Sequence, residues 1–160
     1  MPADKRSDFQ AVLSELRQNN IRDLYVFGGE DAYLKNKLTE ALEKLLIDPA
    51  AKELDRSEYD FSGKPSEGSV VRICDEMETP AFLSVRKLII VKNSGLFADI
   101  SSGLSEILSR AHDRCCIVFL EDKIDKRKKS LIAAVSAKGM IAEINKPDIR
   151  DLRNWTKKEF

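Results

Sequence analysis

The chain has 160 residues, 42% hydrophobic and 34% charged, a composition typical of one globular domain with a substantial core. Its 27 lysines and arginines balance 27 aspartates and glutamates, so any affinity for nucleic acid or a membrane would need a local patch. No stretch approaches the roughly 18 apolar residues of a membrane helix, and the N-terminus lacks a signal-peptide core, so we expect no contact with a membrane.

Apolar residues recur at helical spacing in some stretches and form short continuous runs in others. These patterns predict, in chain order, helix 9–16, strand 24–27, helix 34–45, strand 55–61, helix 70–77, strand 88–91, helix 104–108, strand 115–120, helix 131–135, strand 140–144 and a helix that starts at Pro147. Leu45 is expected on the apolar face of the second helix, and Gly139 is expected to end the helix before the last strand. Strands and helices that alternate in this way predict an α/β fold with a mostly parallel five-stranded sheet flanked by helices.

The three cysteines and the single histidine offer no catalytic or metal-binding set. Cys115 and Cys116 are adjacent in an apolar run and, with Cys74, lack metal-ligand spacing, so we interpret the adjacent pair as buried thiols in a reducing cytoplasm. His112 lies among polar residues without a partner at triad spacing, and we expect it at the surface. The sequence therefore predicts no catalytic residue, no metal site and no cofactor.

A strand, two glycines and a helix near the N-terminus provide the setting of a phosphate-binding loop. Counted from Gly29, the pattern requires a glycine, a lysine and a hydroxyl residue, where the chain has Leu34, Lys35 and Asn36. Leu34 is too bulky for a loop that approaches a phosphate, and Asn36 is a poor substitute for the hydroxyl that binds magnesium.

Acidic residues at the beginning of the second helix also oppose anion binding. Glu30 and Asp31 place two negative charges where the phosphate would lie. We therefore interpret Gly28 and Gly29 as a tight turn into a helix with acidic residues at its N-terminus, and not as a functional nucleotide site.

Two charged features follow the strand at 115–120, and each allows two interpretations. Glu121 and Asp122 stand where nucleotide hydrolases present a magnesium-binding carboxylate, but without a phosphate loop we favour solvated loop residues. The run at 121–129 carries five basic residues against three acidic ones. It forms either a solvated surface or a patch that contacts nucleic-acid phosphates through Lys126, Arg127, Lys128 and Lys129.

A short apolar loop precedes the strand at 88–91. Pro80 ends the helix before it, so Ala81, Phe82 and Leu83 lie on a tight connection. Such a loop either tucks under the sheet or faces outward to meet a partner. Because the connection has to bulge beyond the sheet edge, we expect Phe82 to be substantially exposed and the three residues to form a partner-binding patch.

The chain resembles a known family in three stretches: YVFGGEDAYL at 25–34, TPAFLSVRKLIIVKN at 79–93 and FLEDKIDKRKK at 119–129. In this order and spacing they are similar to the N-terminal domain of the delta subunit of bacterial DNA polymerase III, which belongs to the sliding-clamp loader. The resemblance implies a domain of the AAA+ type at 1–145 that has lost its nucleotide site. Residues 146–160 resemble the start of the family's second, helical domain, inside which the chain ends.

The resemblance also implies a role for the apolar loop. In the family, an apolar pair between the third helix and the next strand inserts into a hydrophobic pocket on the ring-shaped clamp and helps to open the ring. That pair falls on Ala81 and Phe82. A larger apolar residue is usual in place of Ala81, which leaves Phe82, helped by Leu83, as the main anchor.

The function implied by the resemblance is that of a non-catalytic clamp-loader domain, part of the DNA polymerase III holoenzyme in the bacterial cytoplasm. Its partners would be the sliding clamp (the beta subunit), other clamp-loader subunits through a part beyond this chain, and DNA in the full assembly. The fragment itself would be a monomer. The alternative is a divergent P-loop-like hydrolase, which would bind ATP with magnesium.

Overall fold

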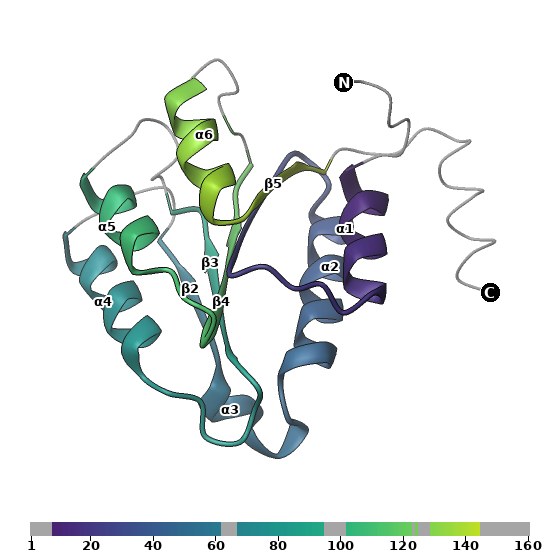
Figure 1. Ribbon diagram of the computed structural model, residues 1–160, viewed down its shortest axis with the longest axis vertical. Coiled ribbons are helices and arrows are strands. Elements are labelled where there is room, and N and C mark those ends of the chain that lie inside the picture. Colours follow the sequence, from purple (N-terminus) through teal and green to yellow (C-terminus); the bar gives the residue numbers. More distant parts are fainter. Residues whose placement is uncertain (1–7, 62–66, 95–101, 123, 125–128, 145–160) are drawn as a thin grey trace.

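Five parallel strands form the centre of the computed structural model, which describes residues 8–61, 67–94, 102–122, 124 and 129–144 (Figure 1). The strands are β1 (Leu24–Gly28), β2 (Arg56–Asp60), β3 (Lys87–Lys92), β4 (Cys115–Leu120) and β5 (Met140–Glu143). They stand in the order β2-β3-β4-β1-β5, and each neighbouring pair is parallel. The predicted sheet is confirmed.

Helices cover both faces of the sheet (Figure 1). Two pack on one face, α1 (Asp8–Arg17) and α2 (Ala32–Leu46). Three pack on the other, α4 (Glu67–Glu78), α5 (Ser102–Arg110) and α6 (Lys129–Lys138). The connection from β1 to β2 crosses the sheet in the opposite direction to the later ones, and right-handed connections then place α2 opposite α4, α5 and α6. Among the described residues, every helix falls short of the length and hydrophobicity that crossing a membrane requires.

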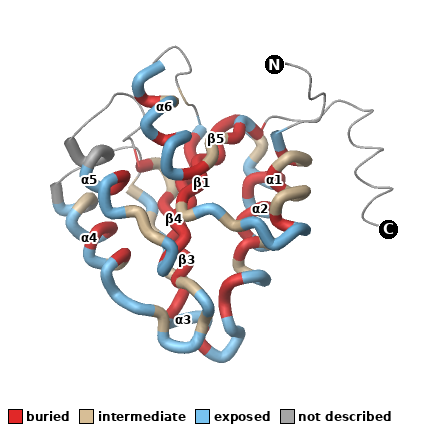
Figure 2. Tube along the Cα trace, in the orientation of Figure 1, coloured by how far each residue is buried: buried red, intermediate tan, exposed pale blue. Residues whose placement is uncertain are grey.

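Strand side chains alternate between two cores, one under each helical layer. Figure 2 shows that the strands at the centre of the sheet consist mostly of buried residues. In β1, Tyr25 and Phe27 pack toward α1 and α2, whereas Leu24 and Val26 pack toward the other helices. β1 and β4 are buried along their whole length, because neighbouring strands cover both of their edges and helices cover both faces. β2 lies at the edge of the sheet and stays partly exposed.

The three cysteines are buried and form no disulfide, as predicted. Burial raises the pKa of the Cys115 thiol to about 11 and that of the Cys116 thiol to about 12. Both thiols are therefore protonated at neutral pH, and they serve as small core residues instead of nucleophiles.

The structure differs from the predictions at two places in and after α2. Leu46 completes the buried face of α2, whereas Leu45 is 41% exposed. Two short helices, η1 (Pro49–Ala51) and α3 (Lys52–Asp55), connect α2 to β2 and were not predicted. They are too short to show helical periodicity.

His112 is half-buried and remains accessible at the surface, where its ring has two partners. Its Nδ1 accepts the backbone N–H of Arg114 at 3.1 Å, and its Nε2 lies 3.1 Å from the carbonyl oxygen of Met77. A ring that accepts at Nδ1 carries its proton on Nε2 and can donate it to this carbonyl. Met77 is in the last turn of α4, where carbonyl groups lack helical partners, so His112 helps to end that helix.

Gly139 follows α6, as predicted, but a close approach rather than a left-handed backbone requires it there. A Cβ atom at this position would lie 1.9 Å from the carbonyl oxygen of Leu24 in β1. That oxygen belongs to the backbone of a central strand and cannot move aside without shifting the strand.

We predict that Gly139→Ala lowers the free energy of unfolding by about 1–3 kcal/mol, because the extra methyl group forces the backbone to shift. Ser136→Ala, at an exposed position of the same helix, is the matched control and should change it by less than about 0.5 kcal/mol. Urea denaturation measures both values. A Gly139→Ala protein as stable as the wild type would contradict the close approach.

Candidate functional site

The strands of the parallel sheet all begin at one end of the domain and all finish at the other. We call these two ends the amino-terminal edge and the carboxyl edge of the sheet, and they are chemically different. In doubly wound folds, ligands usually bind at the carboxyl ends of the strands, where the strand order reverses. Here that place lies between β1 and β4, which lead into Gly29 and into Glu121 and Asp122. The apolar loop at 79–86 lies at the opposite edge, where the strands begin.

The side chain of Lys35 occupies the carboxyl edge. It is 7% exposed, and its Nζ donates to the carbonyl oxygens of Gly29 at 2.9 Å and Glu121 at 3.0 Å. Asp122 Oδ1 lies 3.8 Å from the same nitrogen. The lysine that would reach a phosphate in a nucleotide-binding loop thus joins the ends of β1 and β4 to each other.

Backbone N–H groups of the glycine turn are also bonded within the protein. Gly29, at φ 107°, donates to the carbonyl oxygen of Asp122 at 3.2 Å, and Asp31 donates to that of Ile144 at 3.2 Å. Asp31 is the N-cap of α2, and its side chain accepts the N–H of Leu34 at 3.0 Å. The predicted tight turn with an acidic helix start is confirmed. A phosphate would have to displace these acceptors.

Glu121 is 6% exposed, so the prediction of a solvated residue is wrong for this position. Its Oε2 accepts the backbone N–H of Ser94 at 3.1 Å and the Ser94 hydroxyl at 2.8 Å. The side chain therefore ties the end of β4 to the segment after β3. Asp122, with its side chain 85% exposed, agrees with the prediction. Within the described part of the chain, no three metal-ligating side chains gather.

A cavity of about 170 Å³ lies beside Lys35. It is lined by Ala32, Lys35, Asn36, Lys92, Asn93, Leu120 and Asp122. Both of its lysines are engaged, Lys35 with carbonyl groups and Lys92 with Glu58 at 3.0 Å. The described lining residues therefore offer a phosphate no unpaired cation.

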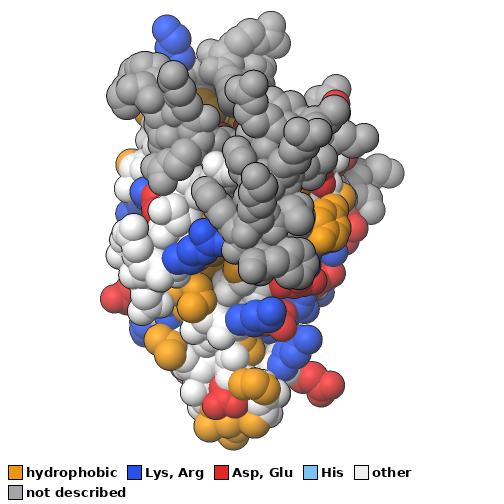
Figure 3. Space-filling model, turned by 90° about the vertical axis from the view of Figure 1, so that its right-hand side faces the viewer, with side chains coloured by type: hydrophobic (Ala, Val, Ile, Leu, Met, Phe, Trp, Pro, Cys, Tyr) orange, Lys and Arg blue, Asp and Glu red, His pale blue; other side chains and the backbone are white. Residues whose placement is uncertain are grey.

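The opposite edge displays the apolar loop. Phe82 is 67% exposed, Leu83 54% and Val85 82%, whereas Ala81 is half-buried. The predicted exposure of Phe82 is confirmed. Leu54, on the neighbouring α3, is 60% exposed; neither it nor Val85 was predicted to belong to the patch. Hydrophobic side chains gather at the lower end of the molecule in Figure 3, where Figure 1 places this loop beside α3.

A buried carboxylate holds the loop from beneath. Asp55, the last residue of α3, is 0% exposed. Its Oδ1 accepts the N–H of Phe82 at 2.5 Å, and its Oδ2 accepts those of Leu83 at 3.0 Å and Ser84 at 2.8 Å. Three consecutive N–H groups thus converge on one side chain, while the apolar side chains of two of these residues are exposed.

The far end of the loop is fixed as well. The Ser84 hydroxyl oxygen accepts the N–H of Asp48 at 2.9 Å. Arg86 Nη2 donates to Asp23 Oδ1 at 2.7 Å and to the carbonyl oxygen of Cys115 at 2.9 Å, where β1 and β4 begin. The protein therefore sets the conformation of the loop although its apolar side chains are exposed.

The charge of Asp55 depends on the same hydrogen bonds. Burial raises the pKa of this carboxyl, but the N–H groups of Phe82, Leu83 and Ser84, with the Ser84 hydroxyl, outweigh it and lower the pKa from 3.8 to about 2. At neutral pH the loop is therefore held by a carboxylate, which makes stronger hydrogen bonds than a neutral acceptor.

Asp55 was not predicted to contribute to the site. It lies in the range predicted as a strand at 55–61, whereas it ends a four-residue helix. Its hydrogen-bond partners lie 27–29 residues further along the chain. No local pattern in the sequence identifies such a contact.

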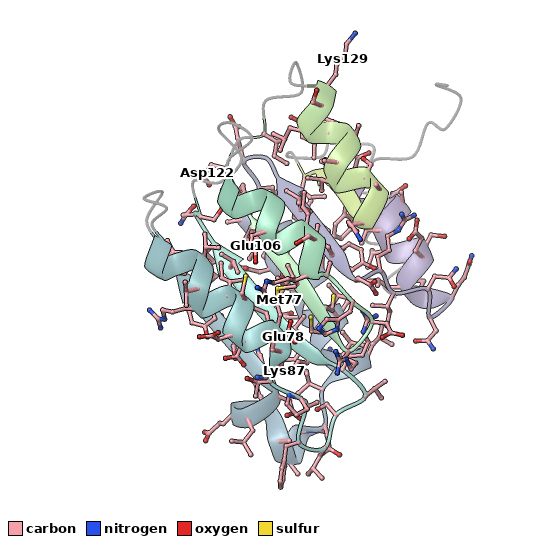
Figure 4. All side chains as sticks on the ribbon, turned by 60° about the vertical axis from the view of Figure 1, so that its left-hand side comes forward. Met77, Glu78, Lys87, Glu106, Asp122 and Lys129 are labelled. Atoms are coloured by element: carbon pink, nitrogen blue, oxygen red, sulfur yellow. The ribbon has the colours of Figure 1, made fainter. Side chains whose placement is uncertain are left out.

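The predicted nucleic-acid patch falls mostly outside the described residues, which exclude Lys126, Arg127 and Lys128. Lys129 begins α6, and its side chain points away from the domain, at the end opposite Lys87 (Figure 4). The second domain predicted at 146–160 also lies outside the described residues. Contact with nucleic acid stays a prediction.

Comparison with known families decides what kind of domain this is. The family model described as DNA polymerase III, delta subunit, matches residues 25–145. The chain belongs to this family. The resemblance inferred from the three sequence stretches is thereby confirmed. No curated protein matches the sequence.

Solved structures share the fold of this delta-family domain. The Bacillus subtilis DNA clamp loader delta protein (YqeN) is similar with a TM-score of 0.77 at 21% identity, over 94% of this chain and 48% of that one. A DNA polymerase III gamma subunit-related protein (tm0771) from Thermotoga maritima gives a TM-score of 0.59 at 16% identity, over 92% and 49%. This chain therefore spans about half the length of each protein.

We predict that Lys35→Met lowers the free energy of unfolding. We also predict that the wild type binds no nucleotide, so the substitution has no nucleotide binding to abolish. The substitution leaves the carbonyl groups of Gly29 and Glu121 without their donor, which costs about 1–3 kcal/mol of unfolding free energy. Lys37→Met, on the exposed side of α2, is the control for chemical denaturation. Calorimetric titration of the wild type with magnesium ATP should show no binding. Micromolar binding that disappears in Lys35→Met would refute this view of the carboxyl edge.

We also predict that Asp55 makes stability depend on pH in the acid range. Because its pKa is about 2 when folded and ordinarily 3.8, its stabilising contribution is complete above about pH 4 and is lost as the pH falls through 2. The shift corresponds to about 2 kcal/mol. The difference in unfolding free energy between wild type and Asp55→Asn should shrink by that amount between about pH 5 and pH 2. A difference that stays constant would show that the carboxylate is not what holds the loop.

Proposed function

We propose that this domain is the clamp-binding module of a clamp-loader subunit that works in DNA replication. The observation that carries the proposal is an exposed apolar loop whose backbone is held in place at the amino-terminal edge of the sheet. Family membership and the similar Bacillus subtilis protein, named a DNA clamp loader delta protein, support it. The partner that we propose for the loop is the ring-shaped sliding clamp.

The loop has the properties of a partner-binding anchor. Single exposed apolar residues are ordinary on protein surfaces, but Phe82, Leu83 and Val85 lie within four residues on one fixed loop. An aromatic side chain that fills a partner's pocket can supply a large share of the binding free energy. We propose Phe82 as the anchor with Leu83 beside it. Ala81 contributes less, because it is small and half-buried.

Leu54 and Val85 widen the proposed surface beyond the three predicted residues. Leu54 directly precedes Asp55, whose carboxylate is bonded to the loop, so it lies at the same end of the domain. A wider apolar surface would compensate for the small side chain at Ala81.

The proposed work is mechanical. A loop that binds the open form of the clamp more tightly than the closed form shifts the clamp toward opening, by as much as the two affinities differ. ATP would be used by other subunits. Contacts with those subunits would come from parts beyond this chain, and contact of Lys126, Arg127, Lys128 and Lys129 with DNA belongs to the proposal for the full assembly.

A divergent nucleotide hydrolase is the weaker proposal. The candidate lysine, Lys35, is bonded to two backbone carbonyl groups, and N–H groups of the turn at Gly29 and Asp31 are bonded to other carbonyl groups. Nucleotide binding there would require these contacts to break.

We predict that Phe82→Ala weakens binding to a bacterial sliding clamp by at least about 2 kcal/mol, roughly thirtyfold. The same substitution should lower the unfolding free energy by less than about 1 kcal/mol, because a ring that is 67% exposed leaves no core cavity. Surface plasmon resonance with immobilised clamp and a thermal melt measure the two effects on one protein.

Tyr33→Ala is the matched control, since Tyr33 is an aromatic residue of similar exposure, 57%, at the start of α2 near the other edge of the sheet. It should bind the clamp like the wild type. Clamp affinity that is unaltered in Phe82→Ala, or reduced equally in both variants, would end the proposal for this loop.

A further inference from the structure

We propose that Asp55 is a positioning residue for clamp binding, which keeps the loop at 82–84 in the conformation that presents Phe82 and Leu83 to the partner. The inference rests on the proposed clamp-binding function and adds a residue that touches no partner. Asp55 is 0% exposed, so any effect it has on the clamp passes through the loop.

The hydrogen bonds account for how the apolar side chains come to face outward. Both carboxylate oxygens of Asp55 are used, Oδ1 by Phe82 and Oδ2 by Leu83 and Ser84. The backbone N–H groups are directed inward to the carboxylate, while the side chains of Phe82 and Leu83 are 67% and 54% exposed. Without the carboxylate, these N–H groups would turn to water, and the backbone would lose the contacts that fix it.

Asp55 is itself held in position by the sheet. Asp55 is followed directly by Arg56, the first residue of β2, which lies opposite Leu88 of β3. At the other side of the short helices, the N–H of Asp48 donates to the hydroxyl oxygen of Ser84 at 2.9 Å. The loop is therefore joined at two places to a segment that the sheet holds in position.

A loop whose backbone is ordered before binding loses less conformational freedom on binding, and this raises affinity without adding a contact. Asn at position 55 keeps the shape of the side chain, but it has one acceptor oxygen and an NH₂ group that faces N–H donors. At least one of the three bonds is then lost. We expect Asp55→Asn to raise the dissociation constant for the clamp about tenfold.

The experiment compares wild type, Asp55→Asn, Phe82→Ala and Val135→Ala in this chain. Clamp affinity is measured well below all melting temperatures, and amide hydrogen exchange is followed at 82–84 and in β3. Val135 is 0% exposed on α6, so its truncation destabilises the core without touching the loop. In Asp55→Asn the amides of 82–84 should lose protection relative to β3 and clamp binding should weaken, whereas Val135→Ala should bind like the wild type.

The positioning role is overturned if Asp55→Asn binds the clamp as tightly as the wild type, or if its amides at 82–84 keep their protection from hydrogen exchange. An equal loss of affinity in Val135→Ala also overturns it, because binding would then follow stability. If the wild type does not bind the clamp, or Phe82→Ala binds unchanged, the proposed function fails and the inference with it. If the wild type binds the clamp and Phe82→Ala is the only variant that binds more weakly, the proposed function stands and only the role of Asp55 is refuted.

Ser84→Ala decides the question if Asp55→Asn does not fold. It removes the hydroxyl group that receives the N–H of Asp48 and leaves the apolar residues intact. Faster exchange at 82 and 83 together with weaker clamp binding supports the positioning role. Unchanged exchange and unchanged affinity overturn it.

Discussion

The hydrogen bonds between the Asp55 carboxylate and three consecutive N–H groups join the segments that enter β2 and β3. Because these strands are parallel neighbours, the segments before them lie at the same edge of the sheet. A buried charge is stable only where polar groups replace the water it has lost, and here the loop backbone supplies them. These hydrogen bonds in turn fix the backbone of the loop. Phe82 and Leu83 are therefore exposed at fixed positions, although apolar residues normally favour the core.

The opposite edge shows how a shared fold can carry a different function. A parallel sheet with a strand–turn–helix at its reversal point has the geometry for a phosphate site, but here Lys35 bridges the ends of β1 and β4. Glu121, where a hydrolase would hold a metal-binding carboxylate, is bonded to Ser94. Fold alone would therefore direct attention to the carboxyl ends of the strands, whereas the placement of individual side chains favours the apolar loop, which we propose as the partner-binding site.

Much of the fold could be predicted because the central strands are buried on both faces and appear in the sequence as continuous apolar runs, as at 88–91 and 115–120. The exposure of Phe82 could also be predicted, because Pro80 confines it to a short connection. Asp55 and Glu121 could not be assigned, since their burial results from contacts with distant residues, the loop in one case and Ser94 in the other. Leu45 was predicted on the buried face of α2 in place of Leu46 for a simpler reason. Neighbouring residues of a helix point in directions that differ by about 100°, and periodicity alone does not fix where a buried face ends.

The proposed clamp-binding surface lies at the amino-terminal edge of the sheet, where the strands begin. Backbone amide chemical shifts of the labelled 160-residue chain, recorded as a bacterial sliding clamp is added, test it most directly. We expect the largest changes at residues 81–85 and at Leu54 in α3, with little change in the glycine turn and around Lys35. Changes centred on the glycine turn, with the loop at 81–85 unaffected, would contradict it.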